Sequence, residues 1–162
     1  MKTLLIVDGN SILNRAFYGI RPLYTKDQFP TNAVYGFITI LKKHLDTLKP
    51  DSLACAFDLR GPTFRHEMFD GYKANRHGMP EELAMQLPWA KKTAAAMGFH
   101  VITCEGYEAD DIIGTLCTAA DADGDTRAYV LTGDRDALQL ITPACSVILA
   151  KTKEDIIYDE AR

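Results

Sequence analysis

The sequence predicts an α/β domain in which a mostly parallel central sheet is flanked by helices. Short apolar, strand-like runs alternate along the chain with longer segments whose apolar residues recur at helical spacing. Such alternation favours crossover connections, which place helices on the faces of a parallel sheet. The 162 residues, 47% of them hydrophobic, are enough for one domain with a sizeable core.

The first half of the chain supplies two predicted strands and one predicted helix. The apolar run at residues 3–7 predicts the first strand. Apolar residues at helical spacing predict a helix over residues 33–48, and Pro50 follows as a stop signal. A second strand is expected at residues 52–57 because this run is again mostly apolar.

The second half continues the alternation. A helix is predicted over residues 81–97, with Pro80 at its start and Gly98 at its end, and Pro88 inside it predicts a kink or a break. The remaining elements follow from the same patterns. They are strands at 100–103, 126–131, 146–150 and 155–158, and helices at 108–120 and 135–140.

The composition argues against several classes of protein. No run approaches the roughly 18 apolar residues of a membrane span, and the first apolar run ends at Asp8, so we expect a strand there and neither a membrane partner nor a signal peptide. The four cysteines form no CxxC pair or Cys/His cluster, which favours reduced core thiols in a cytoplasmic protein over zinc or disulfides. A net charge of −4 argues weakly against nucleic-acid binding.

Carboxylates lie where this fold class places its ligands. In open parallel sheets the ligand site lies beyond the carboxyl ends of the strands. Four aspartates follow predicted strands, and three more acids begin the helix predicted over residues 108–120. The first group is Asp8, Asp58, Asp134 and Asp136, and the second is Glu108, Asp110 and Asp111.

Seven acids at one edge of a sheet would repel each other unless positive charge lies among them. Any one of them alone would be explained as a solvated loop residue or as a helix-cap acid. Together they predict a hard divalent cation, because all-oxygen ligation suits Mg²⁺, Mn²⁺ or Ca²⁺. Two such ions about 3.5–4 Å apart can support in-line displacement at phosphorus. Without these seven acids the remaining chain is basic, so the net charge is compatible with a DNA enzyme.

Five stretches together resemble the 5′-nuclease family, which includes the flap endonucleases. They are LLIVDGNSILNRAFY, VYGF, AFDLRGPTFRHEMFDGYKANR, EGYEADDIIGTL and VLTGDRDALQL. The similarity is greatest to the N-terminal 5′–3′ exonuclease domains of bacterial DNA polymerase I and runs from about residue 4 to about residue 150. It implies a PIN-like, resolvase-like core over residues 1–162 and two bound Mg²⁺ or Mn²⁺ ions.

The resemblance also implies a role for each residue. Asp8 and Asp58 would ligate the first ion, Glu108 and Asp110 would lie at or between the ions with Asp111 beside them, and Asp134 and Asp136 would ligate the second ion. Residues 60–80, a polar segment too long for an ordinary connection, would form a flexible arch or clamp above the site.

Four residues of this arch segment are implied to contact DNA. Lys73 and Arg76 would act in catalysis by gripping the scissile phosphate, Arg65 would contact another phosphate, and Tyr72 would stack on a base. These roles also make chemical sense, because basic side chains neutralise phosphates and aromatic rings stack on unpaired bases of any sequence.

The implied activity is two-metal hydrolysis of DNA at 5′ ends or flaps, in replication primer removal and DNA repair. RNA primers in hybrids are a further implied substrate, and a linked polymerase domain is an implied partner. The family's helical duplex-binding region, with further aspartates, is not found in this chain, so we expect the 162 residues alone to be weakly active or inactive. Two alternatives stay open, a PIN-type ribonuclease and a non-catalytic, metal-dependent DNA-binding fragment. A phosphatase-type hydrolase has less support, because no GxxxxGK[ST] loop is present.

Overall fold

The computed structural model, which describes residues 1–59, 79–151 and 154–161, contains a six-stranded sheet. Its strands are β1 (Lys2–Asp8), β2 (Ser52–Ala56), β3 (His100–Ile102), β4 (Thr126–Thr132), β5 (Cys145–Leu149) and β6 (Ile156–Tyr158). They lie in the order β3-β2-β1-β4-β5-β6. Every neighbouring pair is parallel except β5 and β6, so the predicted fold class is confirmed.

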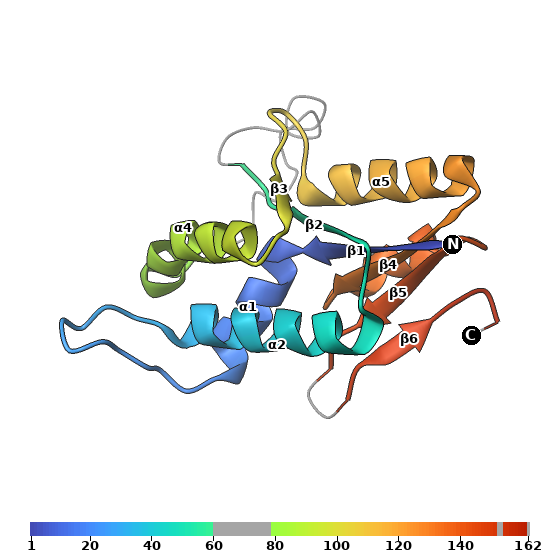
Figure 1. Cartoon of the computed structure of the whole chain (residues 1–162). Coiled ribbons are helices and arrows are strands. Elements are labelled where there is room, and N and C mark those ends of the chain that lie inside the picture. The colour runs from blue at the N-terminus through green and yellow to red at the C-terminus, as the bar shows by residue number, and fades with distance from the viewer. Residues whose placement is uncertain (60–78, 152–153, 162) are drawn as a thin grey trace.

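Helices cover both faces of this sheet (Figure 1). The helices α1 (Gly9–Gly19), α2 (Asn32–Leu48) and α4 (Glu81–Ala96) lie on one face, and α5 (Ala109–Asp123) lies on the other. A short 3₁₀ helix, η1 (Arg135–Leu140), follows β4. Each predicted helix is present within a few residues of its expected bounds. Pro88 was expected to kink or break its helix; it does not break α4, whose residues 81–96 form one helix.

The helix α1 was not predicted from the sequence. Asp8 caps its first turn, with the side-chain Oδ1 accepting the backbone N–H of Ser11 at 3.3 Å. Ile12, Leu13 and Ala16 then lie buried at helical spacing. This apolar pattern is short and follows β1 almost directly. The point where the strand ends and the helix begins is therefore not apparent from the sequence.

Alternation along β1 explains why the sheet has two cores. Leu5 and Val7 are fully buried beneath α1, α2 and α4, whereas Ile6 between them is fully buried beneath α5. Successive side chains of a strand point to opposite faces, so one central strand can serve both cores. A strand buried on both faces is uniformly apolar, as the run LLIV is.

A glycine in the VYGF stretch allows α1 and α2 to pack closely. A Cβ atom built at Gly36 would lie 2.6 Å from Ile20 Cδ1 and 2.7 Å from Ala16 Cβ. Both distances are far below van der Waals contact, so a larger residue would push α2 away from α1. This packing gives a physical reason for the glycine of the VYGF stretch.

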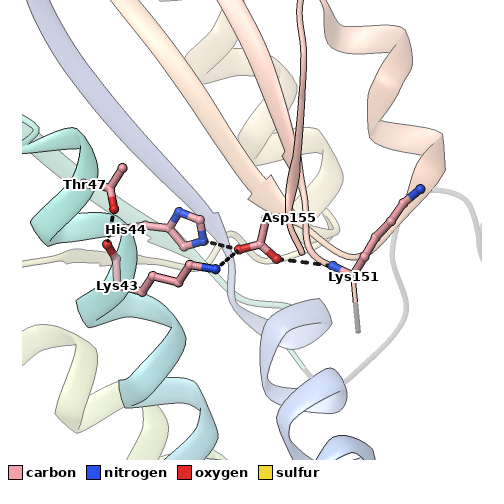
Figure 2. A network of polar contacts seen from close by, with 5 residues as sticks. All are labelled: Lys43, His44, Thr47, Lys151 and Asp155. Carbon is pink, nitrogen blue, oxygen red and sulfur yellow. Dashed lines mark hydrogen bonds and ion pairs between the residues drawn. The ribbon is translucent and has the colours of Figure 1, made fainter. Parts of the chain in front are cut away.

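A polar cluster attaches the segment before β6 to α2 (Figure 2). The Asp155 carboxylate accepts hydrogen bonds from Lys43 Nζ at 3.1 Å and from the Lys151 backbone N–H at 3.3 Å, and lies 2.8 Å from His44 Nε2. Burial lowers the pKa of His44 below its usual value, although Asp155 opposes the shift. The pKa of Asp155 is also lowered, because its burial is outweighed by Lys43, the Lys151 N–H and His44.

The cysteines differ in exposure. Cys55, Cys117 and Cys145 are buried, as expected of core thiols, whereas Cys104 is exposed, so the expectation is wrong for that residue.

Among the helices of the described segments, none combines the length and the apolar character needed to cross a bilayer.

Substitution Asp155→Ala should lower the free energy of unfolding by about 1–3 kcal/mol, because buried His44 loses its partner. Lys43→Ala is the matched control and should cost under about 1 kcal/mol, since an exposed ion pair contributes little. Urea denaturation at pH 7 measures both. Equal losses in the two variants would show that the His44 contact does not contribute.

Candidate metal-binding active site

The site lies at the point where the chain stops adding strands on one side of β1 and starts adding them on the other side. The chain runs outward from β1 through β2 to β3, and then crosses by α5 to β4 on the other side of β1. The carboxyl ends of β1 and β4 therefore border a crevice, the usual ligand position in such sheets. Asp8 ends β1 and Thr132 ends β4, so both residues lie at this crevice.

The first turn of α1 connects the ends of three strands. The Thr132 hydroxyl donates to Asp8 Oδ2 at 2.9 Å, which joins β4 to β1. Asn10 Oδ1 accepts the backbone N–H of Asp58, just after β2, at 2.7 Å. Ser11 Oγ accepts the backbone N–H of Gly133, just after β4, at 2.9 Å. The DGNS tetrapeptide thus positions both of the first two predicted metal ligands.

The glycine of this tetrapeptide is required by close packing. A Cβ atom at Gly9 would lie 2.5–2.8 Å from three ring carbons of Phe57. Phe57 is fully buried and immediately precedes Asp58. Any side chain at position 9 would therefore displace the Phe57 ring and, with it, the start of the Asp58 segment.

The N-terminus of α5 brings Glu108, Asp110 and Asp111 to the same crevice. Asp58 Oδ1 accepts the backbone N–H of Ala109, the first residue of α5, at 2.6 Å. Asp111 Oδ2 accepts the backbone N–H of Glu108 at 2.9 Å, and Glu108 is buried. Free N–H groups and the dipole at a helix start favour nearby negative charge, so the acids are stabilised there before any cation binds.

The electrostatics of Asp8 show which carboxylates approach each other. The pKa of Asp8 is raised to about 7, chiefly by burial and also by the nearby Asp110 and Asp58 carboxylates. The hydrogen bonds from Thr132 and from the Ser11 N–H act in the opposite direction. Asp8, Asp58 and Asp110 are at least 50 residues apart along the chain, yet they lie close enough to affect one another electrostatically.

The remaining predicted ligands extend this acidic surface. Asp134 caps η1 by accepting the Asp136 backbone N–H at 2.9 Å. Asp136 lines an open groove of about 1290 Å³ between α5 and η1, together with Glu108, Asp110 and Asp111. The structure therefore brings the seven acids to one edge of the sheet, in two adjoining groups around Asp8 and around Asp136.

A divalent cation fits this donor set in chemistry and in location. The acids offer only oxygen, as Mg²⁺ and Mn²⁺ prefer. Within the described ranges, no three His, Cys, Asp or Glu side chains are arranged to hold one ion as they stand. One oxygen of each of the Asp58, Asp111 and Asp134 carboxylates accepts a backbone N–H. An ionised carboxylate has further acceptor sites, so these bonds leave capacity for a cation.

The residues that orient the acids were not predicted from the sequence. Asn10, Ser11 and Thr132 were not proposed as site residues. Each lies two or three residues from Asp8 or Asp134 in sequence, but a polar residue near an acid is not by itself a distinctive signal. Arg65, Tyr72, Lys73 and Arg76 lie outside the described residues, so their roles stay predictions.

The fold and the site define a resolvase-like α/β domain with an acidic crevice at the carboxyl ends of its strands. Residues 3–162 match the model of the 5′–3′ exonuclease N-terminal resolvase-like domain. The chain belongs to this family, as the sequence motifs indicated. DNA polymerase I of Caldicellulosiruptor bescii is 44% identical over 152 residues, covering 94% of this chain and 18% of the polymerase. The chain thus spans less than a fifth of that relative.

Solved structures share the fold. The T5 D15 protein co-crystallised with metal ions superposes with a TM-score of 0.72 at 17% identity, over 95% of this chain and 57% of that one. A variant of the bacteriophage T5 D15 flap endonuclease, in a pseudo-enzyme–product complex with DNA and metal ions, has a TM-score of 0.68 at 19% identity. This second match covers 95% of this chain and 57% of the endonuclease.

Substitution Asp8→Asn should stabilise the metal-free protein at neutral pH. The unfolded chain ionises Asp8 near pH 3.8, whereas the folded chain retains the proton to about pH 7. Ionisation therefore opposes folding increasingly between these values and fully above pH 7. We expect a gain of a few kcal/mol at pH 7.5, since each unit of pKa shift corresponds to about 1.4 kcal/mol.

Thermal melts in EDTA at pH 7.5 and pH 4 measure this difference. The variant should melt at a higher temperature at pH 7.5, and its advantage should be much smaller at pH 4. A destabilised variant at both values would show that the Asp8 carboxylate is not electrostatically strained.

Proposed function

We propose that this domain hydrolyses DNA phosphodiesters as a metal-dependent 5′–3′ exonuclease and structure-specific flap endonuclease. The observation that carries the proposal is the convergence of Asp8, Asp58 and Asp110 at the strand-order reversal in a chain of this family. Bringing like charges close to the buried Asp8 carboxylate costs free energy, and a bound cation would offset that cost.

Asp8, Asp58 and Asp110 would hold one divalent ion, and Glu108, Asp111, Asp134 and Asp136 would complete a second position nearby. Mg²⁺ or Mn²⁺ bound there would lower the pKa of an attacking water and offset charge on the phosphate. Thr132 and Ser11 orient Asp8, and Asn10 orients the Asp58 backbone. The protein would therefore contribute ligand geometry at the crevice, with no side-chain nucleophile.

The arch residues would act on the substrate from the other side. Lys73 and Arg76 would bind the scissile phosphate and stabilise its developing charge. Tyr72 would stack on an unpaired base and Arg65 would contact a neighbouring phosphate. Substrates would be DNA 5′ ends and flaps, with RNA primers in hybrids as a further candidate. Primer removal and repair in the cytoplasm, beside a covalently linked polymerase domain, would be the setting.

Two rival functions make different predictions. A PIN-type ribonuclease would cleave an RNA flap in preference to a DNA flap of matched sequence. A non-catalytic DNA-binding domain would bind the flap and release no product, even with Mn²⁺. Because the chain spans less than a fifth of its polymerase relative, cleavage should be compared between the 162 residues and the full-length relative. We expect weak or no cleavage by the former and flap cleavage by the latter.

Substitution Asp110→Ala should weaken Mg²⁺ binding at least tenfold, because it removes a carboxylate from the crevice. Isothermal calorimetry of the 162-residue chain measures this without requiring activity. Asp46→Ala, which removes an exposed acid from α2 on the opposite face, is the matched control and should bind as the unaltered chain does. Unchanged affinity in Asp110→Ala would contradict the ligand assignment.

Substitution Lys73→Ala should leave Mg²⁺ binding unchanged and reduce flap cleavage by two orders of magnitude or more, as expected for the loss of a charge that stabilises the transition state. The substitution is made at the matching position of the full-length relative for the cleavage assay. Lys42→Ala on α2 removes an exposed lysine as a control. Loss of metal binding in the Lys73 variant would show that the lysine acts on the fold.

A further inference from the structure

Two cysteines contact each other where α5 packs on the sheet, away from the acidic crevice. Cys117 is in the middle of α5 and Cys145 is the first residue of β5. Their sulfur atoms are 3.0 Å apart, and both residues are at least 97% buried. Both are free thiols. The contact joins elements 28 residues apart in the chain, so only the fold brings them together.

We propose that Cys117 and Cys145 form an oxidation site that takes an intramolecular disulfide when the protein meets a peroxide. The modification is independent of the nuclease function proposed above. It would join α5, the helix that carries Glu108 and Asp110 near its start, to the inner strand β5.

The geometry allows this bond with little movement. A disulfide has an S–S length of about 2.05 Å, so the sulfurs must approach by roughly 1 Å. No other pairing competes within the described chain. Cys55 belongs to the core on the opposite face of the sheet, and Cys104 is exposed in the segment after β3.

Cys145 is the better nucleophile of the two. The contact with the Cys117 thiol lowers the pKa of Cys145, against the opposing effects of burial and Asp121, and Arg127 lowers it further. Arg127 is held beside the strand start, donating to the Pro143 carbonyl at 3.2 Å and to Ser146 Oγ at 2.9 Å. A thiolate is the reactive form of cysteine, so this cation favours reaction at Cys145.

The chemistry balances in two steps. The Cys145 thiolate attacks hydrogen peroxide, so an S–O bond forms as the O–O bond breaks, and the departing hydroxide takes up the thiol's proton as water. The Cys117 sulfur then attacks the sulfenic sulfur, an S–S bond forms as the S–O bond breaks, and a second water leaves with the Cys117 proton. Two thiols are oxidised to one disulfide, and one peroxide is reduced to two waters.

The cross-link should stabilise the fold. It closes a 28-residue loop, which restricts the unfolded chain. For a domain of this size the expected rise in Tm is on the order of 10 °C. The acids at the other end of α5 would keep their positions, so metal affinity should not change.

The experiment uses Cys104→Ser, which removes the exposed thiol and prevents links between molecules. The folded protein is treated with hydrogen peroxide, unreacted thiols are blocked with N-ethylmaleimide in denaturant, and the chain is digested with trypsin. Cleavage after Lys and Arg places Cys117 on the peptide 93–127 and Cys145 on the peptide 136–151. Mass spectrometry without reductant then reports any link between them.

We expect one linked pair of these peptides, lost on reduction, and a raised Tm that returns to its starting value with dithiothreitol. Adding Cys145→Ser should abolish both effects, whereas adding Cys55→Ser should leave the link in place. The proposal is overturned if, after peroxide treatment of the folded protein, both Cys117 and Cys145 are still alkylated by maleimide. It is also overturned if the two thiols oxidise to separate sulfinic acids, or if the linked protein melts no higher than the reduced one.

Discussion

The structure depends on the hydrogen bonds that the first turn of α1 makes to the ends of β1, β2 and β4. Asp8 and Ser11 bind Thr132 and Gly133 at the end of β4, and Asn10 binds Asp58 just after β2. These short contacts determine how the crevice is shaped, because parallel strands that are joined only by long crossovers have no local turn to align their ends. Gly9 is part of the same constraint, since the Phe57 ring occupies the space of its side chain.

Gathering the acids opposes folding, and the fold offsets this cost with backbone dipoles. The start of α5 donates the Ala109 N–H to Asp58, and a hydroxyl donates to Asp8. The pKa of Asp8 remains raised, chiefly because its carboxylate is buried and also because Asp110 and Asp58 lie near it, so the compensation is incomplete. A bound cation would relieve the remaining repulsion, and part of its binding free energy would be spent on that relief. Metal affinity and the free energy of unfolding are therefore linked.

How much of the site was accessible to prediction varies from residue to residue. Asp8 and Asp58 follow apolar runs, and the parallel-sheet rule places both at one edge. The hydrogen bond from the Glu108 N–H to Asp111 at the start of α5 was not predicted, and the metal role of Asp111 stays a prediction. Asn10, Ser11 and Thr132 were overlooked because a polar residue near an acid in sequence has no distinctive pattern. Their partners are 48 or more residues away, and such pairings appear only when the sheet is assembled.

The sequence by itself determined the fold class, the order of strands and most helices along the chain, and the family, because periodicity and motifs are local properties. Only the tertiary structure decided the strand order in space, the helix α1, the packing of Gly36 against Ala16, and the meeting of Cys117 with Cys145. The reason is that these features depend on contacts between residues distant in sequence. A uniformly apolar strand indicates that both faces of the sheet are buried, but it does not indicate which helix covers each face.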